Sequence, residues 1–152
     1  MTTTTSLLLI TADPSHPLAH LALRYARTYL ANTDTNNNDT NNNNETDSSD
    51  NNENAPAPLN IFFYADAANT ANRLRWQSAD QMNITQAWQK LAEQYQLVLP
   101  VCVSTALSRG ISDSENSTRH QLNSENLAAC FKLVGLSELA MMMQGNCRLL
   151  QF

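Results

Sequence analysis

The sequence has little glycine and no glycine-rich loop. The 152 residues include three glycines, and the turn expected after the first apolar run, residues 12–17, has no glycine and two prolines. Loops that bind the phosphates of nucleotides and flavins present backbone N–H groups from glycine-rich turns, and proline has no N–H group to offer. The sequence therefore argues against a dinucleotide- or flavin-phosphate site in this turn.

Basic residues are also few, and no broad basic patch is apparent. The chain has 14 acidic and 9 basic residues, and residues 32–54 contain six of the acidic residues and none of the basic ones. The rest of the chain, with 8 acidic and 9 basic residues, is close to neutral. Proteins that bind the nucleic-acid backbone need clustered Lys and Arg side chains, so we expect no direct nucleic-acid binding.

Paired cysteines and long apolar runs are absent as well. Cys102, Cys130 and Cys147 form no CxxC motif and no zinc-like pairing with histidine, and their odd number indicates free thiols in a reducing compartment. The apolar run at residues 7–10 is too short for the core of a signal peptide or for a membrane span. The sequence thus predicts a soluble, cytoplasmic protein.

Metal-ligating residues do not form a convincing set. His16 and His20 stand four residues apart, a spacing that two ligands on one helix face would need, but no third ligand is apparent. A magnesium-dependent phosphoacceptor domain is also disfavoured, because the third predicted strand ends in Cys102 and no lysine follows the last one. We expect two solvated histidines and no metal site.

What the chain does contain is an alternation of strand-like and helix-like segments. Apolar runs typical of buried strands lie at residues 6–11, 59–64, 97–101 and 147–152. Apolar periodicity predicts helices at residues 17–30, 84–95, 102–110, 127–134 and 138–144, with Ser15 or His16 near the first cap and Ser137 capping the last. We therefore predict a single α/β domain over residues 1–152, with one doubly wound, mainly parallel sheet and helices on both faces.

Residues 32–54 interrupt this alternation with a low-complexity segment. Eleven of its 23 residues are Asn, and it has no apolar side chain whose burial could offset the entropy of ordering. We interpret it as a disordered Asn/Asp-rich insertion at about residues 32–57. The prolines at 56 and 58 form a stiff connection to the next predicted strand.

Cys102 is the strongest candidate for chemistry, because it lies where a predicted strand ends and a predicted helix begins. In an open α/β sheet, ligands bind beyond the carboxyl ends of the strands, and a helix N-terminus favours a thiolate over a thiol. We expect Cys102 to be the most reactive of the three thiols. The alternative is that Cys102 is a buried small hydrophobe, since free cysteine is among the most buried residue types.

The other notable residues have mainly structural interpretations. Cys130 falls on an apolar helical face and is expected to be inert core, while Cys147 opens a strand and is ambiguous. The pair Arg75 and Trp76 and the methionines at 141–143 fit a protein interface, where Arg, Trp and Met are enriched. Methionine at helical positions is more often core filler, so that alternative stays open.

Several segments together resemble the DsrE/TusD family of sulfurtransferase subunits. They are Phe-Phe-Tyr at 62–64, Asn-Thr-Ala-Asn at 69–72, Ala-Trp-Gln-Lys-Leu at 87–91, Val-Cys-Val-Ser-Thr-Ala-Leu-Ser-Arg-Gly at 101–110, Gly-Leu at 135–136, and Cys-Arg-Leu-Leu-Gln-Phe at 147–152. The likeness runs in order from about residue 7 to residue 152. The insertion at residues 32–54 is the one departure from the family pattern, and it affects no catalytic position.

The resemblance implies that Cys102 is the active cysteine and carries sulfur as a persulfide, without a cofactor. It also implies a complex with TusB- and TusC-like subunits, upstream and downstream sulfur carriers, and a pathway that ends in 2-thiouridine at the tRNA wobble position. Two other functions remain open from the residues themselves. One is a non-catalytic interaction subunit in which Cys102 is merely packed, and the other is a small-molecule binder that uses the crevice at the sheet edge.

Overall fold

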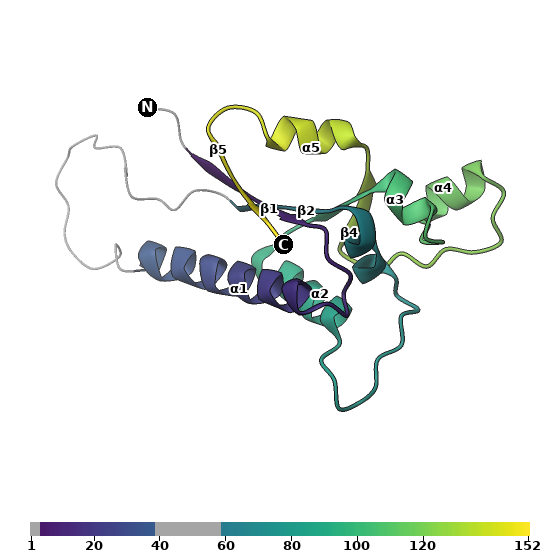
Figure 1. Ribbon diagram of the computed structural model, residues 1–152, viewed down its shortest axis with the longest axis horizontal. Helices are drawn as coiled ribbons and strands as arrows, with labels where there is room; N and C mark the ends of the chain where they lie inside the picture. The colour runs from purple at the N-terminus through teal and green to yellow at the C-terminus, as the bar shows by residue number, and fades with distance from the viewer. Residues whose placement is uncertain (1–3, 39–58) are drawn as a thin grey trace.

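A computed structural model describes residues 4–38 and 59–152, which form one five-stranded sheet. The strands are β1 (Thr5–Ile10), β2 (Leu59–Phe63), β3 (Leu99–Cys102), β4 (Phe131–Val134) and β5 (Cys147–Gln151). Their order is β4-β3-β2-β1-β5, and every neighbouring pair is parallel. Helices lie on both sides of the sheet (Figure 1), so the predicted fold class is confirmed.

One face of the sheet is covered by two long helices, α1 (Pro17–Asn38) and α2 (Ile84–Tyr95). The helix α2 begins where Asn83 Oδ1 accepts a hydrogen bond from Gln86 N, and it ends where Gln96 adopts the left-handed conformation. Its Trp88 packs edge-on against Phe63 of β2, with ring centroids 5.3 Å apart. This face holds the larger core cluster of the protein.

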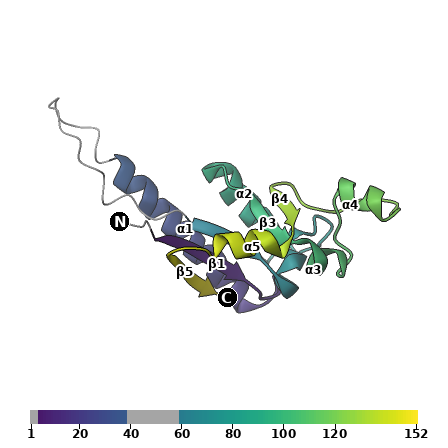
Figure 2. The ribbon, with the colours of Figure 1, turned by 90° about the horizontal axis from the view of Figure 1, so that it is seen from above.

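The opposite face is covered much more thinly. The helix α5 (Leu136–Met142) lies over the strands there (Figure 2) and has no fully buried residue. The only fully buried members of the hydrophobic cluster on this face, among the residues described, are Leu7, Phe62 and Cys102. Because side chains alternate along a strand, these three residues belong to the face opposite the larger core.

Short helices fill the connections at the carboxyl ends of the strands. A 3₁₀ helix, η1 (Ala65–Ala71), follows β2, and α3 (Val103–Leu107) follows β3 directly. Further along, α4 (Ser114–Arg119) begins at Asp113, whose side chain accepts a hydrogen bond from Asn116 N. The sequence had shown little periodicity there, because α4 is too short to display it.

The structure corrects the prediction of a helix at residues 127–134. Residues 131–134 form β4, which pairs with β3, and Ala128 N donates to the carbonyl of Ala71 just before it. The spacing of four apolar residues suited a helix equally well, and the free edge of β3 decides for the strand. The next helix begins after Gly135, so Ser137 is not its cap.

The start of the expected insertion is also corrected. The helix α1 continues to Asn38, so residues 32–38 are helical. Once a helix is nucleated, each added residue gains a backbone hydrogen bond, and Thr33 Oγ1 also donates to Tyr29 O. The remainder of the predicted insertion lies outside the described residues. Within the described parts of the chain, none of the helices is long and apolar enough to cross a membrane.

Candidate active site at Cys102

Cys102 occupies the junction that the sequence predicted. It is the last residue of β3 and the residue that precedes the first turn of α3. Its carbonyl accepts a hydrogen bond from Thr105 Oγ1 at 3.1 Å, which fixes the start of α3. In the sheet it pairs with Val134 of β4. The backbone around this cysteine is therefore held on both sides.

The thiol itself is enclosed. Cys102 is 1% exposed, whereas Cys130 and Cys147 are partly exposed. The apolar cluster that surrounds it combines strand residues with two side chains of α5, Leu139 and Met142. The helix α3 that follows has five residues and is too short to develop much of a dipole. Cys102 is thus at the predicted junction but buried, and a reaction at its thiol requires an opening motion.

An ion pair ties α3 to the neighbouring turn. Arg109 Nη2 lies 2.8 Å from Asp66 Oδ1 in η1, and Arg109 Nη1 donates to the carbonyl of Thr105 at 3.1 Å. Ala65, which begins η1, has a positive φ of 54°, a conformation that costs a non-glycine residue some free energy. Together these contacts hold η1 against the segment that carries Cys102.

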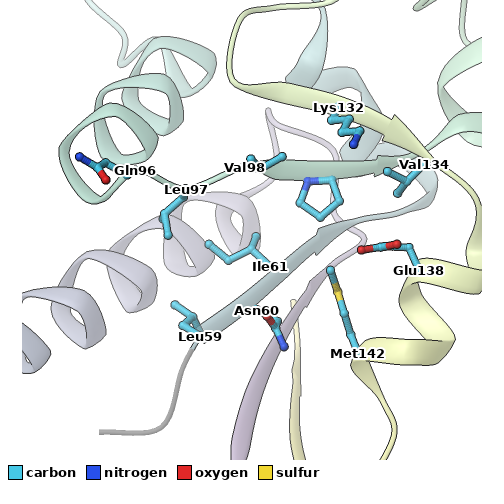
Figure 3. A pocket seen from close by; sticks show the side chains of 11 residues that line it. Leu59, Asn60, Ile61, Gln96, Leu97, Val98, Lys132, Val134, Glu138 and Met142 are labelled. Carbon is cyan, nitrogen blue, oxygen red and sulfur yellow. The ribbon is translucent and has the colours of Figure 1, made fainter. Parts of the chain in front are cut away.

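A cavity of about 410 Å³ adjoins the Cys102 cluster on the α5 side of the sheet (Figure 3). Val134 and Met142 line this cavity and also pack in the cluster around Cys102, so these two side chains separate the cavity from the buried thiol region. Glu138 and Met142 extend from α5 toward the strands, and Lys132 lies on β4 opposite. The wall toward Cys102 thus includes a flexible methionine side chain.

The two other cysteines cannot pair with Cys102 inside one chain. The carbonyl of Cys130 accepts a hydrogen bond from Leu99 N, three residues before Cys102, which corresponds to about 10 Å along the strand. Cys147 opens β5, which lies three strands away from β3, or about 14 Å across the sheet. Disulfides need Cα atoms within about 7 Å.

Cys130 also differs from its expected role as inert core. It is partly exposed and has a φ of 72°, because it forms the turn that leads into β4. Its side chain packs only at the margin of the larger core. The helical face on which it was placed does not exist.

The histidines and the predicted interface residues have clear positions. His16 Nδ1 accepts a hydrogen bond from Leu18 N at the start of α1, so it caps that helix. In residues 4–38 and 59–152, no three His, Cys, Asp or Glu side chains are grouped as metal ligands. Trp76 is 82% exposed and Met141 is 64% exposed, so both are available at the surface, whereas Met142 packs beside Cys102.

Comparison with known proteins places these features in a family. The model of the DsrE/DsrF-like family matches residues 6–152. The chain belongs to the DsrE/DsrF-like family. The crystal structure of the YchN protein from E. coli has the same fold, with a TM-score of 0.62 and 16% identity over 98% of this chain and 99% of that one.

Relatives of this DsrE/DsrF-like protein include proteins named sulfurtransferase TusD. The one from Sodalis glossinidius is 38% identical over 92 residues, and the one from Pectobacterium atrosepticum is 39% identical over 92 residues; each match covers 60% of this chain and 71% of the relative. A TusD homolog of Vibrio vulnificus is 36% identical over 94 residues, 62% of this chain and 72% of the relative. The resemblance seen in the sequence is thereby confirmed.

The sequence alone does not reveal two features of the structure around Cys102. The pair of Asp66 and Arg109 joins residues 43 positions apart, and no local pattern connects them. The second feature is the cover formed by α5, because in the sequence Leu139 and Met142 are only apolar positions of a short helix. The face of the sheet that α5 covers could be identified only from the strand order.

Proposed function

We propose that this protein is a sulfur-relay subunit in which Cys102 accepts sulfur as a persulfide and passes it on. The observation that carries the proposal is the position of Cys102 at the carboxyl end of β3, in a chain whose relatives are named sulfurtransferase TusD. Ligands and reactive groups of open α/β sheets lie at this edge. The family resemblance implies the same residue.

The chemistry needs only the thiol of Cys102, a donor persulfide and an acceptor thiol. The thiolate of Cys102 attacks the outer sulfur of a donor persulfide, the donor's S–S bond breaks, and the donor leaves as a thiolate. Cys102 then holds the transferred sulfur in a new S–S bond. A thiolate of the acceptor attacks that outer sulfur in turn and releases the thiolate of Cys102, so no external oxidant or reductant is consumed.

The distances between Cys102 and the other two cysteines favour transfer of sulfur to a partner protein over reaction within the chain. A second cysteine within disulfide range would attack the persulfide of Cys102 and release the sulfur as sulfide. Cys130 lies about 10 Å from Cys102 along the strand alone, and Cys147 lies about 14 Å from it across the sheet alone, so both are beyond that range. The next thiol to react with a Cys102 persulfide is therefore one that a partner protein brings.

Transfer requires that α5 uncovers the thiol. Leu139 and Met142 of α5 pack against the Cys102 cluster, while the helix has no fully buried residue that would anchor it strongly. Elements with few buried contacts open locally at low free-energy cost. A partner that displaces α5 would gain access to Cys102 only while it is docked, which protects the persulfide from stray thiols at other times.

The burial of Cys102 also fits a second function, that of a non-catalytic interaction subunit. If Cys102 is only a packing residue at 1% exposure, the protein is a non-catalytic subunit whose fold supplies a docking surface. The two functions differ in one measurable property, which is whether sulfur ever resides on Cys102.

Mass spectrometry of the protein purified with its partners tests the proposal directly. We expect a gain of about 32 Da, one sulfur atom, on the peptide containing Cys102. The Cys102→Ser variant should lose the gain and sulfur transfer while keeping its fold, and Cys147→Ser is the matched control that should keep both. Sulfur found on Cys147 instead, or transfer that survives in Cys102→Ser, would favour the packing role.

The partners and the pathway belong to the same proposal. TusB- and TusC-like subunits would join this chain in a hetero-oligomer, and the sulfur would reach the 2-thiouridine of the tRNA wobble position through a downstream carrier. Co-expression followed by size-exclusion chromatography should give one species larger than the single chain. A chain that elutes alone under these conditions would contradict the assembly.

A further inference from the structure

We propose that the pocket between the start of α1 and the loop before α2 binds an oxyanion, a carboxylate or a phosphate, through Arg75. This pocket has a volume of about 350 Å³. Its lining is formed by Pro14, Ser15, His20, Arg75, Gln77, Gln81 and Met82. The proposal goes beyond the sulfur chemistry and stands independently of it.

One nitrogen of the Arg75 guanidinium lacks a hydrogen-bond acceptor. Its Nη1 is the one buried side-chain nitrogen or oxygen without a hydrogen-bond partner among the described residues. Arginine carries five N–H donors and stays charged, and a buried donor without an acceptor destabilises a fold. The Arg75 side chain also lines the pocket, so a small rotation of the guanidinium would bring its N–H donors to a ligand with negatively charged oxygens, in the geometry that guanidinium prefers.

Asp13, whose charge interacts with that of Arg75, does not supply this acceptor. Asp13 accepts hydrogen bonds from Ser15 N at 2.9 Å, from Ser15 Oγ at 2.6 Å and from Asn69 Nδ2 at 3.1 Å. Burial alone would raise the pKa of Asp13, but these hydrogen bonds and the charge of Arg75 outweigh it and hold the pKa below its usual value. Asp13 is therefore ionised and already committed to Ser15 and Asn69, and no ion pair joins it to Arg75 in the described structure.

The remaining walls of the pocket suit an anion of modest size. His20 and Gln77 also line the pocket, and both side chains can donate hydrogen bonds. A second hollow shares Ser15 and His20 with this pocket and is also lined by Arg24, which adds a positive charge in the neighbourhood. The pocket lies at the carboxyl ends of the strands, on the edge where α/β sheets hold their ligands.

Trp76 provides a direct signal for this site. It follows Arg75 in the chain and is 82% exposed, whereas the other tryptophan, Trp88, is 1% exposed in the larger core. Changes in fluorescence on binding near Arg75 are therefore expected to come from Trp76. An anion on Arg75 would change the surroundings of Trp76 and leave those of Trp88 unchanged.

The test titrates the full chain with sodium phosphate, with glutarate and with an acetylated hexaglutamate peptide, all at constant ionic strength. We expect a saturable change in tryptophan fluorescence, confirmed by calorimetry. Arg75→Gln should weaken binding at least about tenfold, since it removes the charged hydrogen bonds. Arg75→Lys should weaken it less, because the charge stays. Arg27→Gln, an exposed arginine of α1 outside the pocket, is the control and should bind as the parent does.

Each result of the titrations either supports the anion site at Arg75 or overturns it. Saturable binding of phosphate or glutarate that depends on Arg75 supports a site for a free anion. Binding of the peptide alone, again dependent on Arg75, supports a site for an acidic side chain of a protein partner. No saturable response to any of the three probes, or equal binding by the parent and a folded Arg75→Gln variant, overturns the proposal.

Discussion

The burial of Cys102 under α5 predicts how its thiol reacts with an alkylating reagent. In the resting protein, Cys130 and Cys147 should be labelled before Cys102, because their side chains are partly exposed. Cys102 should react only through a local opening of α5, and its rate should follow the equilibrium population of the open form. This revises the expectation, drawn from the sequence, that Cys102 reacts first.

Met142→Ala should make this opening more frequent. Truncating a fully buried methionine costs about 2–5 kcal/mol, and for the partly buried Met142 we expect about 1–2 kcal/mol. Since about 1.4 kcal/mol corresponds to a tenfold change, labelling of Cys102 should accelerate about five- to thirty-fold. Quenched alkylation followed by peptide mass spectrometry gives the rates of all three thiols in one experiment.

Two controls separate local opening from general destabilisation. Met141→Ala makes the same change one residue away, at a side chain that is 64% exposed, and should leave the Cys102 rate within about twofold. Leu91→Ala weakens the core on the other face of the sheet and should leave the Cys102 rate nearly unchanged if α5 opens alone. Labelling that accelerates with Leu91→Ala but not with Met142→Ala would refute access through α5.

Three further predictions concern stability. Asp13→Asn should lower the free energy of unfolding by about 1 kcal/mol at neutral pH, because it weakens the hydrogen bonds from Ser15 and Asn69. The folded pKa of Asp13 lies below its ordinary value of 3.8, so this difference should persist above pH 4 and disappear as the pH falls through the folded pKa. Urea unfolding at several pH values would show this. Phe152→Ala should cost about 1–3 kcal/mol, because the ring packs against Tyr25 at 6.1 Å; an unchanged urea midpoint would contradict this. Deleting residues 39–54 should change the unfolding free energy by about 1 kcal/mol or less and preserve sulfur transfer, and loss of transfer in a folded deletion variant would make that segment functional.

The sequence was sufficient for the parts of the fold that depend on local signals. Continuous apolar runs located β1, β2, β3 and β5, and the Asn83 cap with a regular apolar face located α2. It failed at β4, where the same apolar spacing suits a helix, and only pairing with β3 decides. Low complexity also predicts too early an end for α1, because helix propagation continues through residues 32–38.

The candidate site was predictable in position but not in accessibility. Cys102 could be placed at a strand–helix junction from the local pattern. Whether its thiol faces solvent depends on α5. This helix connects β4 at one edge of the sheet to β5 at the other, and it therefore crosses the face on which Cys102 lies. The unpaired guanidinium of Arg75 was likewise invisible in the sequence, because it results from a loop that packs beside the start of α1.

Because all strands run in the same direction, the sheet has one end where the strands begin and an opposite end that carries Cys102. The helix α1 has 22 residues and spans about 33 Å, whereas the six residues of β1 span about 20 Å. The helix therefore runs back along the sheet and extends past the end at which the strands begin (Figure 1). The described chain stops at Asn38 and resumes at Leu59, both at that end, while Cys102 lies at the other. A fluorescent reporter or an immobilising tether joined between Asn38 and Leu59 would consequently be held away from the reacting thiol, which makes this connection the natural place to engineer the protein.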